Sequence, residues 1–167
     1  VWADKVPFAT LTTTSVFLGA GRDASNREKL RENGVRYILN VADDVPNFHK
    51  DDPGVAYCNL DVGDFGADAG ISRVFPKAAE FLRSAEEGEG GVLVHCANGS
   101  NRSATCVVAC VMILDKVNLA QAWATVKAAR SSAMPLRDNI AELLSFEREL
   151  YPVLVANSMT ERDFYRR

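Results

Sequence analysis

A thiol and a guanidinium stand six residues apart in one short segment, at Cys96 and Arg102. The apolar run 91–94 before it predicts a buried strand, and the apolar run 103–114 after it predicts a buried helix. A loop between a strand end and a helix start directs backbone N–H groups at an anion, and the helix dipole adds positive charge there. Because the same field favours thiolate over thiol, we predict that Cys96 is a nucleophile at the base of an anion-binding loop.

The other loop residues fit the binding of a phosphoryl group. Arg102 supplies a planar fork that matches two phosphoryl oxygens. Gly99 can adopt a positive φ where the backbone must approach the anion. We expect Ser103 to donate a hydrogen bond to the sulfur, which helps it leave a phosphocysteine, and His95 to orient the loop. The predicted phosphate-binding residues of the loop are Ala97, Asn98, Gly99, Ser100, Asn101 and Arg102.

The pattern His-Cys-x-x-Gly-x-x-Arg-Ser, from His95 to Ser103, resembles the signature of the cysteine-dependent protein tyrosine phosphatases. Its final Arg-Ser-Ala-Thr is most similar to the dual-specificity branch, and segments 16–19, 34–41, 75–79 and 143–147 are also similar, especially to MAP-kinase phosphatases. The resemblance implies hydrolysis of phosphotyrosine and phosphoserine or phosphothreonine through a phosphocysteine. It also implies a phosphorylated protein substrate, with a MAP kinase as the candidate, and no metal or organic cofactor.

Phosphoryl transfer from an alcohol or phenol also needs an acid to protonate the leaving oxygen and a base to activate water. Three aspartates follow Tyr57, where a predicted strand gives way to a glycine-containing loop. Asp64 matches the family's general acid by its distance after Tyr57 and before Cys96. Asp61, inside the strand pattern, and Asp68, which could instead cap the next helix, are alternatives. The remaining interpretation is that all three are solvated loop acids.

Arg130 has two interpretations. It matches a basic position that contacts a second substrate phosphate in some relatives, and it also stands at the end of a predicted helix, where a cation interacts favourably with the dipole. The segment 131–139 departs from the Ser-Pro-Asn run common in MAP-kinase phosphatases, so kinase preference is open. The loop residues at 97, 98, 100 and 101 are neutral, which favours a phosphoprotein over a polyphosphorylated lipid headgroup.

Two other functions fit the same residues. One is a phosphatase of a non-protein substrate, such as a phosphoinositide, a glycan or an RNA 5′ end, and Asn101-Arg102 is similar to the RNA triphosphatase loop. The other is a module that binds phosphorylated partners without turnover. The presence of Cys96, Arg102, Ser103 and Asp64 together argues against such a module. Rates on phosphopeptides and on the other phosphates would distinguish these classes.

Composition suits one domain: the chain has 167 residues, of which 47% are apolar. A net charge of −3 gives no reason to expect nucleic acid or an anionic membrane as partner. No apolar run reaches about 18 residues and the first residues do not resemble a signal peptide, which predicts an intracellular protein of the cytoplasm or nucleus. The sequence does not determine the oligomeric state.

The four cysteines show no paired Cys-x-x-Cys spacing for a metal. Cys106 and Cys110 lie one turn apart on an apolar helix and are predicted core thiols. Cys58 has two interpretations: it is a buried structural thiol, or it is a disulfide partner that would protect Cys96 from oxidation.

Strands alternate with helices along the chain, which predicts an α/β fold with a central, mainly parallel twisted sheet of about five strands flanked by helices. This is the fold of the protein tyrosine phosphatase family that the chain resembles. The predicted strands are 16–18, 35–41, 55–62 and 91–94, and the predicted helices are 25–33, 71–86, 103–115, 119–130 and 139–150. We expect an extended lead-in over 1–14, the catalytic domain over 15–150 and a tail over 151–167. The site then lies at the carboxyl end of a strand.

Overall fold

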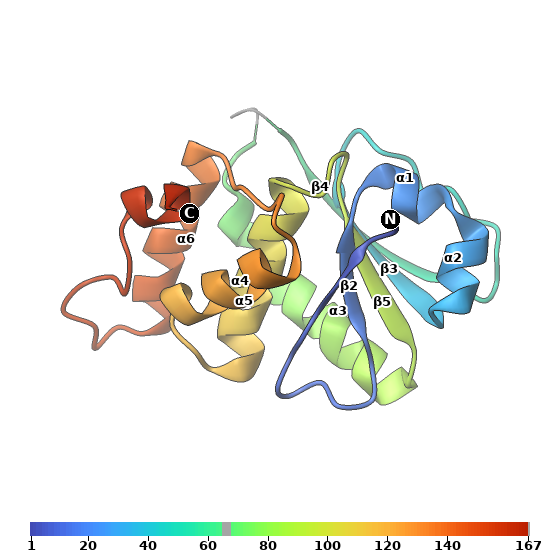
Figure 1. The fold of residues 1–167 in the computed structure, drawn as a ribbon, viewed down its shortest axis with the longest axis horizontal. Helices are drawn as coiled ribbons and strands as arrows, with labels where there is room; N and C mark the ends of the chain where they lie inside the picture. The colour runs from blue at the N-terminus through green and yellow to red at the C-terminus, as the bar shows by residue number, and fades with distance from the viewer. Residues whose placement is uncertain (65–67, 167) are drawn as a thin grey trace.

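A computed structural model describes residues 1–64 and 68–166, and the described residues form a five-stranded sheet in the order β1-β2-β5-β3-β4 (Figure 1). β1 pairs antiparallel with β2, and the other neighbours are parallel. The sheet is therefore mixed, with the mainly parallel arrangement that the sequence predicts. Its strands are β1 (Asp4–Val6), β2 (Val16–Gly19), β3 (Val35–Ala42), β4 (Ala56–Val62) and β5 (Gly91–His95).

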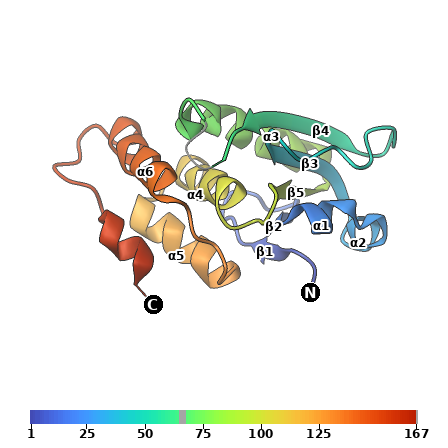
Figure 2. The same cartoon turned by 90° about the horizontal axis from the view of Figure 1, so that it is seen from above.

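Helices lie on both sides of the sheet (Figures 1 and 2). Two short helices, α1 (Gly21–Ser25) and α2 (Arg27–Glu32), cover one face. α3 (Phe75–Gly88) and α4 (Arg102–Asp115) pack on the other face, and α5 (Leu119–Ala129) and α6 (Arg137–Leu150) pack against α4. Two 3₁₀ helices, η1 (Ile71–Val74) and η2 (Glu161–Tyr165), come before α3 and after α6.

The central strands are apolar on both faces because both faces are covered. Successive side chains of a strand point to opposite faces, so Leu18, Leu39 and Val94 join the large core with α3 and α4. Phe17, Ile38 and Leu93, which alternate with them, join a smaller core beneath α1 and α2. Full burial of each such side chain stabilises the fold by roughly 1.5–3 kcal/mol, so the sheet holds the site on a rigid support.

The structure differs from the sequence prediction mainly at helix starts. The prediction missed α1, whose first turn closes when Asp23 Oδ2 accepts the N–H of Ala20 at 2.8 Å. Ala20 has no capping side chain, so the sequence pattern does not show this start. The helix predicted from residue 25 begins at Arg27, where the Asn26 side chain accepts the Lys29 N–H. The helix predicted over 71–86 is divided into η1 and α3.

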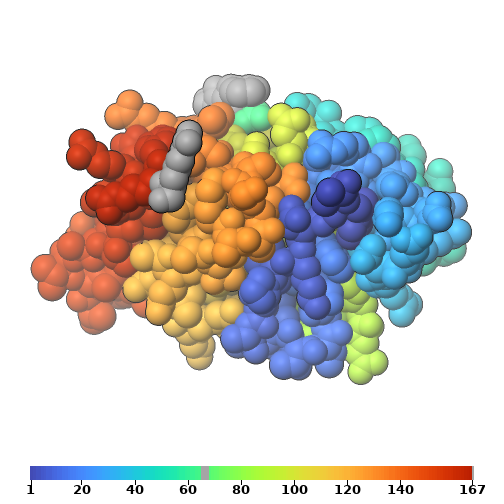
Figure 3. All heavy atoms as spheres, viewed as in Figure 1, coloured from blue at the N-terminus to red at the C-terminus, as the bar shows by residue number. Residues whose placement is uncertain are grey.

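The lead-in over residues 1–14 contains β1, which the sequence analysis missed, and it is held by carboxylates of the core helices. Glu86 accepts the backbone N–H groups of Thr12, Thr13 and Thr14, and Asp115 accepts those of Ala9 and Thr10. In Figure 3 the dark-blue lead-in crosses the front face between the light-blue helices and the orange segments. The division of the chain at 14/15 and 150/151 stays a prediction.

No helix among residues 1–64 and 68–166 has both the length and the apolar character needed to cross a membrane.

Candidate active site

Cys96 directly follows β5, and α4 begins at Arg102, so residues 96–101 form the loop between a strand end and a helix start. The Cys96 side chain is buried. Its Sγ lies 3.1 Å from the Ser103 hydroxyl and accepts the backbone N–H of Gly99 at 3.3 Å. Both contacts come from the loop or the first turn of α4, so the sulfur sits at the base of the loop.

Each backbone carbonyl from Cys96 to Asn101 points away from the interior of the loop and makes a hydrogen-bond contact there. Because the N–H and C=O of a planar trans peptide point in opposite directions, outward carbonyls leave the following N–H groups facing inward. Among the described residues, no protein acceptor binds the backbone N–H groups of Asn98, Ser100 or Asn101. The carbonyl contacts are His95 Nδ1 at 3.1 Å from Cys96, Gly21 N–H to Ala97, Arg130 Nη2 to Asn98, Arg130 Nε to Gly99, Met134 N–H to Ser100 and Thr105 N–H to Asn101.

Gly99 is required by its position in this loop. Its φ is +71°, in the left-handed region, and a Cβ would lie 2.5 Å from the Gly19 carbonyl oxygen. Neither condition suits a residue with a side chain. The loop therefore passes close to the end of β2.

The Arg102 guanidinium is 1% exposed and is surrounded by oxygen atoms. Nη1 donates to the Val62 carbonyl at 2.9 Å and lies 3.0 Å from Asp44 Oδ1, and Nη2 lies 3.5 Å from Asp64 Oδ2. Within the described part of the chain, no acceptor reaches the buried Nε. Leaving a buried donor unpaired costs roughly 1–3 kcal/mol, so this atom is a site where an oxyanion would be favoured.

Asp64 lies beside Arg102 and the loop rather than in the surrounding solvent. Its side chain is 20% exposed, and Oδ1 accepts a hydrogen bond from Asn101 Nδ2 at 2.8 Å. The prediction for Asp64 as acid thus falls on a carboxyl that contacts two residues of the Cys96 segment. It follows β4, which contains the strained residue Asp61 at φ +52° and an irregular register with β3.

The two alternative aspartates are placed differently. Asp68 accepts the backbone N–H groups of Gly63 and Gly70 and is paired with Arg73. Its carboxylate is therefore used by contacts with nearby residues of its own segment. These donors outweigh partial burial and lower the pKa of Asp68. Asp61 is exposed on β4. Of the three carboxyls, Asp64 is the one that contacts Asn101 and Arg102 in the described part of the chain.

His95 is fully buried under the loop, and its Nδ1 lies 3.1 Å from the Cys96 carbonyl oxygen. Burial lowers the pKa of His95, outweighing that hydrogen bond and the charge of Asp23. A neutral ring with its proton on Nδ1 can donate to this carbonyl, which places His95 as a support for the loop.

Arg130 also supports the loop, through two of its carbonyls. Besides bonding the Asn98 and Gly99 carbonyls, its Nη1 is paired with Asp4 Oδ2 at 2.8 Å. The guanidinium is buried, with an exposed fraction of 8%. A second substrate phosphate would have to compete with Asp4 here, so that interpretation stays a prediction.

Sequence reasoning missed several residues that the fold brings to this site. Asp43 and Asp44, which directly follow β3, each have a carboxylate oxygen close to Arg102 Nη1, at 3.5 Å and 3.0 Å. Asn139 donates to the Asn101 side chain from the start of α6. These partners are distant in sequence from the signature, and nothing in their own segments indicates the contact.

The other thiols lie outside this arrangement. Burial raises the pKa of Cys110 to about 12 and that of Cys106 well above its ordinary value, as expected for inert core thiols. Cys58 is half-buried, and burial raises its pKa too. All four cysteines are free thiols. In the described part of the chain, no three His, Cys, Asp or Glu side chains are placed to hold a metal ion.

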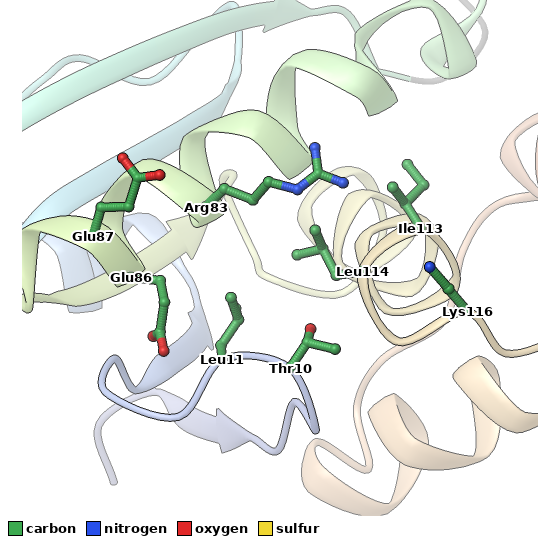
Figure 4. A pocket seen from close by; sticks show the side chains of 8 residues that line it. All are labelled: Thr10, Leu11, Arg83, Glu86, Glu87, Ile113, Leu114 and Lys116. Atoms are coloured by element: carbon green, nitrogen blue, oxygen red, sulfur yellow. The ribbon is translucent and has the colours of Figure 1, made fainter.

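A separate cavity of about 360 Å³ lies between the lead-in and the C-terminal ends of α3 and α4 (Figure 4). Leu11, Arg83 and Ile113 are among its lining residues. α4 has 14 residues, so this end lies roughly 20 Å from the end that carries Arg102. The cavity is therefore distinct from the Cys96 loop.

The fold and the loop define an oxyanion site with a thiol at its base. Comparison with known proteins shows the family to which a chain with this site belongs. The sequence model of the dual specificity phosphatase catalytic domain matches residues 16–149, so the chain belongs to that family. Human dual specificity protein phosphatase 9 is 36% identical over 146 residues, covering 87% of this chain and 38% of that protein. Human dual specificity protein phosphatase 14 is also 36% identical, covering 83% of this chain and 69% of that protein.

Solved structures agree with this assignment. The crystal structure of human DUSP28 is similar with a TM-score of 0.75 and 31% identity, covering 90% of this chain and 97% of the other. A human tyrosine phosphatase-like serine/threonine/tyrosine-interacting protein is similar with a TM-score of 0.70 and 28% identity, covering 80% and 91%. The chain spans little more than a third of several curated relatives, including 38% of phosphatase 9 and 35% of human dual specificity protein phosphatase 6.

Proposed function

We propose that this domain hydrolyses phosphotyrosine and phosphoserine or phosphothreonine in proteins through a phosphocysteine on Cys96. The observation that carries the proposal is the arrangement of the loop from Cys96 to Arg102: outward carbonyls, inward N–H groups and an Arg102 Nε that no acceptor in the described part of the chain reaches. Such an array stabilises an anion without reorganising during the reaction. A phosphoryl dianion would bind the N–H groups of residues 97–102 and the Arg102 fork, with phosphorus next to Sγ.

In the first step the Cys96 thiolate attacks phosphorus and the bond from phosphorus to the substrate oxygen breaks. Asp64 gives its proton to that oxygen, so the alcohol or phenol leaves uncharged. In the second step water attacks phosphorus, Asp64 takes a water proton, and the phosphorus–sulfur bond breaks. The Ser103 hydroxyl, 3.1 Å from Sγ, donates to the departing thiolate. Inorganic phosphate leaves, and no step uses a metal or an organic cofactor.

The charge around the site favours a phosphoprotein over a polyanionic substrate. The carboxylates of Asp43 and Asp44 are 50% and 61% exposed and lie beside Arg102. A phosphoinositide or an RNA 5′ end would bring further negative charge toward them. A peptide with one phosphate at the loop avoids this repulsion, and basic residues next to it would be attracted. A MAP kinase is our candidate substrate, on the family resemblance, and the catalytic domain would be residues 15–150.

The thiolate chemistry also requires a reducing environment, which supports an intracellular location in the cytoplasm or nucleus.

The test is release of phosphate from a peptide phosphorylated on both Thr and Tyr, with reductant and a chelator present. We expect release from both residues, and its loss in Cys96→Ser, which should still bind the peptide. Retained activity in Cys96→Ser would overturn the mechanism. Faster turnover of phosphoinositides, glycans or RNA 5′ ends would overturn the substrate class, and binding without any turnover would identify a binding module.

A further inference from the structure

The side chain of Asn101 joins three parts of the site. Asn101 is the N-cap residue of α4, yet its side chain makes no capping hydrogen bond, which is the usual role of Asn there. Instead Oδ1 accepts the Leu136 backbone N–H at 2.7 Å and Asn139 Nδ2 at 3.0 Å. Nδ2 donates to Asp64 Oδ1 at 2.8 Å. The side chain is thus used entirely for contacts between segments.

These contacts fix which way the amide faces. A backbone N–H can only donate, so the atom of Asn101 that meets Leu136 must be the oxygen. Asn139 fills the second lone pair of that oxygen. The NH₂ group must then face Asp64. Asn101 is also buried, with an exposed fraction of 8%, so water competes little with this hydrogen bond.

We propose that Asn101 is the positioning residue for the acid Asp64, which deepens and rests on the proposed function. Its N–H occupies Oδ1, so the proton for the leaving group is carried on Oδ2, the oxygen 3.5 Å from Arg102 Nη2. Because Asn101 belongs to the phosphate-binding loop, it fixes the acid relative to the phosphorus. The Leu136 N–H, which can only donate, in turn prevents the amide from rotating away. The backbone N–H of Asn101 keeps its proposed role of binding the phosphoryl group.

A residue that acts through an acid matters most when the leaving group needs its proton. The experiment compares kcat/KM for phenyl phosphate, whose phenolate is a poor leaving group, with kcat/KM for an aryl phosphate whose phenol is strongly acidic, because kcat/KM covers only the steps up to release of the phenol. We expect Asn101→Ala to lower kcat/KM for phenyl phosphate by about tenfold or more, with a much smaller loss for the substrate with the acidic phenol. Asn101→Asp, which keeps an acceptor for Leu136 but cannot donate to Asp64, should change the ratio in the same direction.

The ratio of the two rates is measured on one sample, so it does not depend on the fraction of folded enzyme. Asn139→Ala is the matched control because it removes a contact of Asn101 but leaves the donor to Asp64, and its ratio should stay closer to wild type. In an Asp64→Asn background, Asn101→Ala should not change the ratio further. Equal losses on both substrates, or a full further change in that background, would overturn the proposal. If the wild-type protein shows no turnover that depends on Cys96, the proposed function itself is overturned instead.

Discussion

Arg130 and Arg102 share the loop but meet it in opposite ways. Arg130 donates to loop carbonyls from outside and is paired with Asp4, whereas Arg102 begins α4 and has a buried N–H that no acceptor among residues 1–64 and 68–166 reaches. One guanidinium therefore shapes the loop, and the other is available to the anion. This difference leads to separate predictions for the two residues.

We expect Arg130→Lys to weaken the binding of inorganic phosphate by several-fold, because one ammonium cannot reproduce bonds to both the Asn98 and Gly99 carbonyls, each worth about 1 kcal/mol. The inhibition constant of phosphate measures this. Asp4→Asn, which removes the ion pair but not the carbonyl bonds, should have a smaller effect. If phosphate inhibition is unchanged and only doubly phosphorylated peptides lose affinity, Arg130 is instead a second-phosphate site.

Arg102→Lys should reduce kcat/KM by about 10²–10³, because a point charge cannot bind two phosphoryl oxygens as a fork does. Steady-state kinetics on a phosphotyrosine peptide measures the loss. Arg137→Lys is the matched control, since that side chain is 83% exposed and pairs with Glu161 on the surface. Normal turnover by Arg102→Lys would contradict the proposal that Arg102 binds two oxygens of the phosphoryl group.

At the residue scale, the sequence indicates the Cys96 loop but not the contacts that hold the loop in place. The spacing from Cys96 to Ser103 and the family resemblance identify the residues of the loop. The contact of Asn101 with Asn139 joins residues 38 positions apart. It falls in the segment that departs from the MAP-kinase phosphatase pattern, so no motif indicates it.

Among the elements, α3 does more than cover the sheet. Glu86 near its end accepts three consecutive N–H groups of the threonine run, and its side chain points toward the lead-in while Glu87 points away (Figure 4). These hydrogen bonds outweigh desolvation and lower the pKa of Glu86 from 4.5 to about 2. The carboxylate thus ties the lead-in, and with it β1, to the helix.

Glu86→Gln should lower the free energy of unfolding at neutral pH. A folded-state pKa below the unfolded value gives stability that is complete above pH 4.5 and is lost as the pH falls toward about 2. The difference between wild type and variant should therefore shrink across this window in urea titrations. Glu87→Gln makes the same charge change without these bonds. A pH-independent difference would contradict the assignment.

The strands from β2 onward and the long helices follow from apolar patterns, whereas β1 and α1 do not. β5 and α4 are continuous apolar runs, so the sequence predicts both within one residue of their observed ends. Besides the Ala20–Asp23 hydrogen bond at its start, α1 has a contact with a distant segment, because the backbone oxygen of Asp23 within it accepts Trp2 Nε1, and β1 exists by pairing with β2. A local pattern contains neither partner.

For the whole molecule, the C-terminal segment packs back on the domain. Phe164 in η2 is 1% exposed, and its ring centroid lies 5.0 Å from that of Trp123 in α5. Glu147 of α6 accepts from the N–H of Leu119 at the start of α5 and from Ser158. The predicted tail therefore contributes to the core on the side of α5 and α6.

Phe164→Ala should lower the free energy of unfolding by about 3 kcal/mol, as for other buried aromatic truncations, with little change in kcat. Urea unfolding and phosphopeptide kinetics measure the two effects. Tyr165→Ala, at a 53% exposed neighbour, should be close to neutral. Equal stability of Phe164→Ala and wild type would mean that the segment does not pack as described.

The most direct test of the central claim is to trap the phosphocysteine. Asp64→Asn turning over an aryl phosphate with a strongly acidic phenol lacks the base for the second step, so the intermediate should accumulate. After acid quenching, mass spectrometry should find one phosphoryl group on the peptide that contains Cys96. Turnover with no phosphoryl group on Cys96, together with an active Cys96→Ser enzyme, would contradict the account.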